Sequence, residues 1–173
     1  MLTRKDPAIP QPVFHTPGHD HARCEADALA EAEAACATRG ARLTPTRRSV
    51  LQILLSGHRP IGAYEIMDRL AKDGTRPAPI TVYRALDFLL EQGLVHRLAS
   101  RNAFMACIHN HAATDNVVFL ICEQCGIVGE ASSIAVMRTI NDAAGAAGFI
   151  PKDPVIEVTG LCAHCRPAST ASA

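Results

Sequence analysis

Seven cysteines occur in the 173-residue sequence, and four of them form two Cys-x-x-Cys pairs. The first pair is Cys122 with Cys125, and the second is Cys162 with Cys165. A Cys-x-x-Cys turn directs two thiolates at one point, so two such turns supply the four sulfurs of a closed tetrahedral zinc site. The pairs therefore predict a structural zinc site. A redox dithiol and two unrelated pairs are the competing interpretations.

A second group of residues of metal-binding types lies on both sides of the first pair in the sequence. A thiolate combined with imidazole and carboxylate suits zinc, whereas iron and manganese sites more often use only nitrogen and oxygen ligands. If these ligands came from two structural units, a bound ion would favour one arrangement of the units over another. Each residue taken alone can equally be an ordinary core or surface side chain. The group comprises His96, Cys107, His109, His111, Asp115 and Glu130.

The charge is unevenly distributed, although 17 basic and 17 acidic residues cancel in the total. Residues 39–101 contain 11 basic and 5 acidic side chains, a net of +6, and the segments on either side each carry 3 basic and 6 acidic side chains, a net of −3. A local basic excess is typical of a module that meets phosphate, so the middle third predicts DNA binding. The alternative is an ordinary solvated basic surface.

The same third of the chain has the periodicity of short helices followed by a hairpin. Helices are expected over 22–39, from Thr44-Pro45 to Ser56, over 63–71 and over 81–91. Two short strands, 95–98 and 103–106, flank a polar turn. This order predicts a winged helix-turn-helix, in which one helix enters the major groove.

The polar face of the 81–91 helix is the predicted DNA-reading surface. The guanidinium of Arg84 can pair with guanine, while Tyr83 can contact a phosphate or a thymine methyl, and Thr81 lies on the same face. Nearby arginines are expected to contact phosphates. These are Arg47, Arg48, Arg97 and Arg101.

The remainder predicts a small α/β domain, which makes the whole chain α+β. Strands are expected at 116–121, 127–128 and 155–158, with a helix beginning after Ser132-Ser133. The predicted divisions are a flexible Pro- and His-containing tail (1–21, with His15, His19 and His21), a winged-helix domain (22–106), a hinge (107–116), a dimerisation and metal-binding domain (117–166) and a disordered tail (167–173). The N-terminal histidines have no assigned role.

Several segments resemble the ferric uptake regulator family, and specifically its zinc uptake regulator branch. They are Arg42-Leu-Thr-Pro45-x-Arg47, Ala63-Tyr64-Glu65, Thr81-Val-Tyr-Arg-Ala-Leu-Asp-Phe-Leu-Leu-Glu-Gln-Gly93, Phe119-Leu-Ile-Cys-Glu-Gln-Cys-Gly126 and Gly160-Leu-Cys-Ala-His-Cys165. The resemblance covers about residues 25–166. It implies a homodimeric repressor that binds a palindromic operator when zinc is plentiful and so controls zinc uptake genes.

The resemblance also implies two sets of zinc ligands. The structural ligands fall on the two Cys-x-x-Cys pairs, and the sensory ligands fall on His96, Cys107 and Glu130. The fourth sensory ligand is Asp115 or His111. Sensing of iron, manganese or peroxide is the alternative within the family, and Cys107 favours zinc over these.

Other functional classes fit the sequence less well. A zinc hydrolase would keep an open metal position beside a general base, and the His-x-Glu motif of zinc deaminases does not occur, so no enzymatic activity is expected. A dithiol oxidoreductase is the remaining enzymatic alternative. The N-terminus lacks the apolar core of a signal peptide, and the longest apolar run, 117–122, is far shorter than the roughly 20 residues of a membrane helix. These features predict a cytoplasmic protein with neither a membrane nor a small organic substrate as partner.

Overall fold

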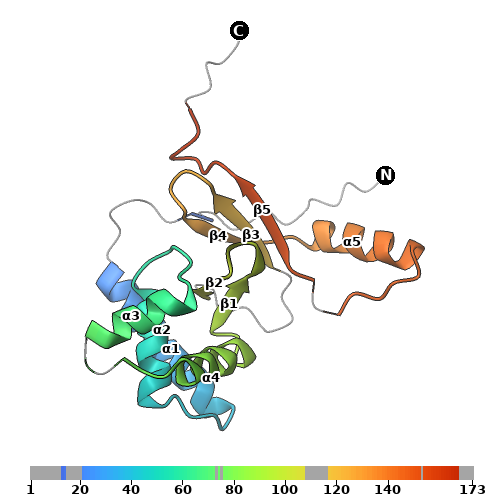
Figure 1. Cartoon of the computed structure of the whole chain (residues 1–173). Helices are drawn as coiled ribbons and strands as arrows, with labels where there is room; N and C mark the ends of the chain where they lie inside the picture. Colours follow the sequence, from blue (N-terminus) through green and yellow to red (C-terminus); the bar gives the residue numbers. More distant parts are fainter. Residues whose placement is uncertain are drawn as a thin grey trace. The chain divides into compact units, whose positions relative to one another are not determined.

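The computed structural model describes residues 13–14, 21–72, 74, 76–107, 117–152 and 154–167. The chain divides into two compact units (Figure 1). The winged unit spans residues 16–113, and the sheet unit comprises residues 114–173 together with Val13 and Phe14. No helix of the described residues is long and apolar enough to cross a membrane.

The winged unit consists of helices followed by a two-stranded antiparallel wing, and it confirms the predicted winged helix-turn-helix. Its elements are α1 (His21–Thr38), α2 (Pro45–Leu55), α3 (Ala63–Lys72), α4 (Pro79–Glu91), β1 (Val95–Leu98), a 3-10 turn (Ala99–Arg101) and β2 (Ala103–Ala106). The wing pairs Val95 with Ala106 and Leu98 with Ala103. Asn102 closes the turn in the left-handed conformation, with φ of 46°, which asparagine tolerates better than most residues.

Helix α4 begins two residues before the predicted start. Pro79 occupies its first turn, where a missing backbone N–H costs no hydrogen bond. Helix α2 likewise has Pro45 in its first turn, and Thr44 occupies the N-cap position without a side-chain capping hydrogen bond. The remaining boundaries of the winged unit lie within about two residues of the predicted ones, the usual uncertainty of helix ends.

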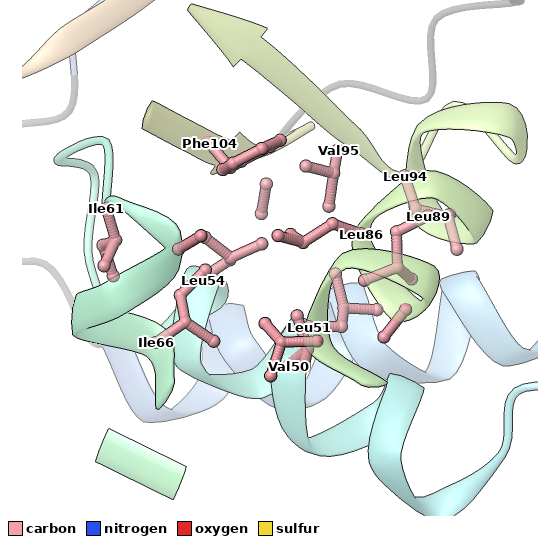
Figure 2. Close-up of a cluster of buried hydrophobic side chains, with 14 of the residues drawn as sticks. Val50, Leu51, Leu54, Ile61, Ile66, Leu86, Leu89, Leu94, Val95 and Phe104 are labelled. Atoms are coloured by element: carbon pink, nitrogen blue, oxygen red, sulfur yellow. The ribbon is translucent and has the colours of Figure 1, made fainter. Parts of the chain in front are cut away.

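The core of the winged unit forms where the apolar faces of the helices meet the wing. Leu54 of α2 and Leu86 of α4 are fully buried and point toward one another in Figure 2, with Phe104 of β2 lying over them. Ile61 joins this core through a two-way backbone bridge to Phe104, with N···O distances of 2.8 and 2.9 Å. The other buried apolar residues of these elements include Val50, Leu51, Ile66, Met67, Val82, Leu89 and Val95. The polar faces of the helices are thereby directed away from the core.

Cys36 belongs to this core and to neither group of predicted metal ligands. It is a buried residue of α1, and burial raises the pKa of its thiol despite the nearby Arg39 and Arg47. A buried thiol held in its neutral form behaves as a small apolar side chain. We therefore regard Cys36 as a packing residue.

The sheet unit contains a three-stranded sheet and one helix. Its elements are β3 (Val117–Cys122), β4 (Val128–Ser132), α5 (Ile134–Ala146) and β5 (Ile156–Gly160). The strand order is β4-β3-β5, with β4 antiparallel and β5 parallel to the central β3. A parallel pair needs a crossover, which the segment containing α5 supplies. The predicted helix after Ser133 is present, and the Ser133 side chain accepts a hydrogen bond from Val136 N–H.

Two strands of the sheet unit differ in extent from the prediction. Strand β4 continues to Ser132 instead of stopping at Val128. The predicted strand is too short because Gly129 and Glu130 interrupt the apolar pattern, although both residues pair with β3. Strand β5 begins at Ile156 and runs to Gly160, so it reaches the second Cys-x-x-Cys pair.

The segment 1–21, predicted as a flexible tail, includes two described residues with defined packing. Val13 and Phe14 are partly buried and lie against Gly129 of β4. Their apolar side chains account for this packing, which the surrounding prolines obscure in the sequence. His15 and His19 lie outside the described residues, and His21 begins α1.

Candidate metal centres and nucleic-acid interface

The two Cys-x-x-Cys pairs converge because β3 and β5 run parallel and side by side. Cys122 is the last residue of β3 and lies opposite Gly160, the last residue of β5. The turns that follow the two strands therefore leave the same end of the sheet. Glu123 N–H, in the first turn, donates to the Gly160 carbonyl at 2.9 Å and joins the two ends directly.

Cys122, Cys125, Cys162 and Cys165 form a four-cysteine cluster with the spacing of a tetrahedral metal site. All four sulfurs lie within 4.8 Å of one another, and the Sγ atoms of Cys125 and Cys162 are 3.8 Å apart. A tetrahedron with Zn–S bonds of about 2.3 Å places its sulfurs about 3.8 Å apart, whereas a disulfide brings them to about 2.0 Å. The cysteines thus fit a zinc ion and do not form a disulfide.

Backbone hydrogen bonds hold both turns in shape. Gly126 N–H donates to the Cys122 carbonyl at 2.9 Å, with Gly126 in the left-handed conformation at a φ of 73°. Cys165 N–H donates to the Cys162 carbonyl at 3.0 Å. Cys162 N–H in turn lies 3.4 Å from the Cys122 sulfur. These hydrogen bonds fix the backbone of both turns and so help to set the positions of the four sulfurs.

The electrostatics of the cluster favour a cation. Hydrogen bonds from the backbone amides of Cys125 and Cys162 lower the pKa of Cys122 to about 6. Burial and the neighbouring thiols raise the pKa of Cys165 to about 12. Four adjacent thiols do not all ionise near neutral pH unless a positive charge lies among them.

Two of the predicted sensory ligands lie together in the winged unit. His96 lies on β1 opposite Met105, and Cys107 immediately follows β2, held by a 2.9 Å hydrogen bond from its N–H to the Leu94 carbonyl. A nitrogen of His96 and the sulfur of Cys107 lie within 4.8 Å of each other. The wing therefore presents an imidazole and a thiol side by side.

The remaining sensory candidates belong to the sheet unit or lie outside the described residues. Glu130 lies on β4 opposite Phe119, and with 5% of its surface exposed it is the single buried charged side chain among the described residues. A buried carboxylate needs a counter-charge or hydrogen-bond donors, and a metal ion is one such partner. Asp115, His111 and His109 fall within the segment 108–116, which the structure does not describe.

The predicted DNA-reading residues form an exposed face on α4. Thr81, Tyr83 and Arg84 are exposed, while Val82 and Leu86 on the opposite face are buried in the core. Arg101 is exposed in the turn of the wing. The helix therefore has one face that anchors it and one that can contact a ligand.

Two arginines predicted to contact phosphate are engaged within the winged unit. Arg47 places its guanidinium carbon 3.5 Å from the centroid of the Phe88 ring, and its Nη1 donates to the Arg42 carbonyl at 2.8 Å. Arg48 forms an ion pair with Glu33 of α1. Both therefore join helices to one another.

An exposed aromatic residue is missing from the sequence-based set. Tyr64, in the first turn of α3, is 70% exposed, more than Tyr83 at 40%. An exposed tyrosine in a DNA-binding module can contact phosphate or stack on a base. The signal in the sequence was an aromatic residue on the polar side of an amphipathic helix.

Comparison with known proteins identifies the family. The model of the ferric uptake regulator family matches residues 38–159, more than half of the chain and parts of both units. The chain belongs to the ferric uptake regulator family. Within it, the chain is 42% identical over 137 residues to the zinc uptake regulation protein of Escherichia coli strain K12, covering 79% of this chain and 80% of the relative. It lies in the zinc uptake regulator branch, which confirms the resemblance noted in the sequence.

Solved structures and a more distant relative agree with this placement. A zinc uptake regulator complexed with zinc and DNA superposes with a TM-score of 0.76 at 40% identity, covering 81% of this chain and 93% of that one. Holo XcZur superposes with a TM-score of 0.73 at 43% identity, with coverages of 81% and 96%. The peroxide-responsive repressor of Staphylococcus aureus strain USA300 is only 28% identical, over 80% of this chain and 91% of the relative.

Proposed function

We propose that this member of the ferric uptake regulator family is a zinc-responsive transcriptional repressor. In this proposal it binds operator DNA as a homodimer when zinc is plentiful and represses zinc uptake genes. The observation that carries the proposal is the similarity to a zinc uptake regulator complexed with zinc and DNA, which extends over 81% of the chain at a TM-score of 0.76. The basic winged unit and the four-cysteine cluster each support one part of it.

The first part is a structural zinc ion held by the four-cysteine cluster. The 3.8 Å separation between the Cys125 and Cys162 sulfurs supports this assignment. The ion supplies a positive charge that keeps all four cysteines as thiolates. Its binding contributes to folding, because apparent zinc-binding free energies reach about 10–16 kcal/mol in small zinc domains. The sheet unit has only a three-stranded sheet and one helix among its described residues, so this contribution is large compared with its core.

The second part is a regulatory zinc site. We assign His96, Cys107 and Glu130 as ligands, with Asp115 or His111 as the fourth. The adjacent imidazole and thiol of the wing support the assignment, and the mixed nitrogen, sulfur and oxygen donors suit zinc. Because these ligands come from both units of the chain, a bound ion would restrict the angle between them.

The third part is the coupling of this site to DNA. If zinc favours the arrangement that binds DNA, then DNA must tighten zinc binding by the same factor. Shifting the active population from 1% to 99% requires about 5.5 kcal/mol of differential binding, which one zinc ion can supply.

The fourth part is recognition of DNA by α4. Arg84 and Tyr83 project from its exposed face, and Thr81 shares that face. We assign Arg84 to a base contact, because its guanidinium can donate two hydrogen bonds to guanine, and Arg101 to a phosphate contact. A symmetric dimer places two copies of α4 in successive major grooves, so the operator should be palindromic.

A regulator with these partners acts in the cytoplasm, and we assign it no catalytic activity. Sensing of peroxide, iron or manganese is the second candidate, favoured by the 28% identity to the peroxide-responsive repressor. The thiol of Cys107 beside His96 supports zinc over these alternatives.

The experiment that tests the proposal is DNA binding by the full-length protein with and without its exchangeable zinc. Fluorescence anisotropy would follow binding to a labelled fragment of the protein's own promoter and to a scrambled fragment of equal length. A mild chelator should abolish the preference for the promoter while about one tightly held zinc ion per chain remains. A preference that persists after all exchangeable zinc has been removed would overturn the proposal.

A further inference from the structure

Val13 and Phe14 pack on the sheet unit at a place where a strand lacks a side chain. A Cβ atom at Gly129 would lie 2.7 Å from Val13 Cγ1, 2.7 Å from the Val13 carbonyl oxygen and 3.1 Å from Phe14 Cε1. Gly129 is not among the glycines in the left-handed conformation, so its backbone does not require glycine. A glycine inside a strand often marks the close approach of another backbone, and here that backbone is Val13.

The segment extends across one face of the sheet. Gly129 of β4 pairs with Leu120 of β3, and Leu120 pairs with Val158 of β5, so the three residues form a row on one face. Phe14 lines a cavity of about 200 Å³ together with Leu120 and Val158. The Phe14 ring therefore lies over apolar residues from the centre of the sheet as well as over its edge.

The same cavity borders the four-cysteine cluster. Cys122 and Cys162 contribute to its wall, as do Gly160 and Leu161, which connect β5 to the second cysteine pair. Phe14 is thus part of the wall of a cavity that two of the four cysteines also border on this face of the sheet. Nothing in the winged unit is needed for this arrangement, since every residue involved belongs to the sheet unit.

We propose that the Val13-Phe14 segment is a docking segment that covers the sheet beside Cys122 and Cys162 and slows access of chelators and oxidants to the zinc-bound sulfurs. Ligand exchange at a closed tetrahedral site requires a competing group to reach the metal or a leaving thiolate. The Phe14 ring in the wall of this cavity restricts the room for such a group until the segment detaches. The inference rests on the proposed structural zinc, whereas the docking itself does not.

The first test compares Phe14→Ala with the parent protein, both full-length and zinc-loaded. Zinc transfer from the four-cysteine cluster to excess 4-(2-pyridylazo)resorcinol should be about tenfold faster in the variant, which is the effect of losing part of the burial of one aromatic side chain. Two N-terminal truncations make the same comparison without any substitution. Removal of residues 1–12 should leave the rate unchanged, and removal of residues 1–16 should raise it as Phe14→Ala does.

The second test displaces the segment without altering it. Gly129→Ala places a methyl group against the Val13 backbone, so chymotrypsin should cleave after Phe14 faster than in the parent. Gly57→Ala is the matched control, because a Cβ there meets nothing within 4 Å, and it should change neither cleavage nor zinc transfer. Circular dichroism would establish that Gly129→Ala retains its fold.

The outcomes separate this inference from the proposed function. Unchanged zinc transfer in both Phe14→Ala and the 1–16 truncation would overturn the shielding role. Equal chymotrypsin cleavage in Gly129→Ala and the parent would overturn the docking itself. Absence of zinc from the four-cysteine cluster would contradict the proposed structural zinc, and the cleavage comparison would still report on docking.

Discussion

The guanidinium carbon of Arg47 lies 3.5 Å from the centroid of the Phe88 ring, so α2 and α4 are joined by a cation–π contact. The same arginine donates to the Arg42 carbonyl, which ties the segment before α2 to the pair. Because α4 carries the face that we assign to DNA reading, we predict that Arg47 influences DNA binding by positioning the helix. The phosphate contact expected from its charge stays a prediction, and the two roles give different results on mutation.

Replacing Arg47 by alanine should therefore reduce stability. A cation–π contact contributes about 0.5–2 kcal/mol depending on its exposure, and we expect a loss of free energy of unfolding in that range. Urea unfolding followed by circular dichroism measures it, with the exposed Arg59→Ala as the matched control. Unchanged stability combined with weaker binding to every DNA sequence would instead make Arg47 a phosphate contact.

Replacing Arg84 by alanine should weaken operator binding and relax sequence preference. Loss of a bidentate contact to guanine costs about 1–3 kcal/mol of discrimination, whereas loss of a phosphate contact weakens all sequences alike. Arg101→Ala should weaken binding to all sequences alike and should make binding less dependent on salt concentration. Anisotropy titrations against operator and scrambled DNA at several salt concentrations distinguish the two. A uniform loss in Arg84→Ala would contradict its assignment to a base.

Loss of zinc from the four-cysteine cluster should unfold the sheet unit and leave the winged unit folded. Cys125→Ser removes one ligand, and without the ion the remaining thiols lack the charge that holds them together. Far-UV circular dichroism should retain most of the helical signal, because four of the five helices belong to the winged unit among the described residues. Cys24→Ser, outside both ligand sets, is the control. A stable sheet in zinc-free protein would show that the cluster is not structural.

Replacing Cys107 by serine should separate the two metal sites. The variant should remain folded with zinc in its four-cysteine cluster, and it should lose zinc-dependent DNA binding because a neutral serine hydroxyl is a poor substitute for a thiolate ligand. Zinc content by atomic emission and anisotropy with operator DNA give the two readouts. Normal zinc-dependent binding in this variant would show that the regulatory site is assigned to the wrong residues.

Much of the fold follows from local patterns in the sequence. The wing strands have the predicted bounds, because two short apolar runs flank a polar turn. The predicted start of α4 is two residues late, since Pro79 resembles part of the preceding break and in fact occupies the first helical turn. The predicted β4 is too short because Gly129 and Glu130 resemble the end of a strand when packing is unknown.

The parts of the site that depend on long-range packing could not be predicted. The cysteine spacing indicates a metal site, but the convergence of the pairs depends on the parallel pairing of β3 and β5, which no local pattern specifies. The stacking of Arg47 on Phe88 likewise depends on how α2 crosses α4. Val13 and Phe14 are two apolar residues in a Pro-rich stretch, and the sheet face and cavity wall to which Phe14 contributes exist only in the folded sheet unit.

The central claim is that zinc at a regulatory site switches on DNA binding, and a metal titration tests it most directly. Full-length protein, with its four-cysteine cluster already filled, would be titrated with buffered free zinc, ferrous iron or manganese in the presence of labelled promoter DNA, and anisotropy would be recorded. We predict tight binding that begins only as free zinc rises above the level that fills the structural site. Binding that is indifferent to zinc, or that iron or manganese switches on instead, would contradict the assignment.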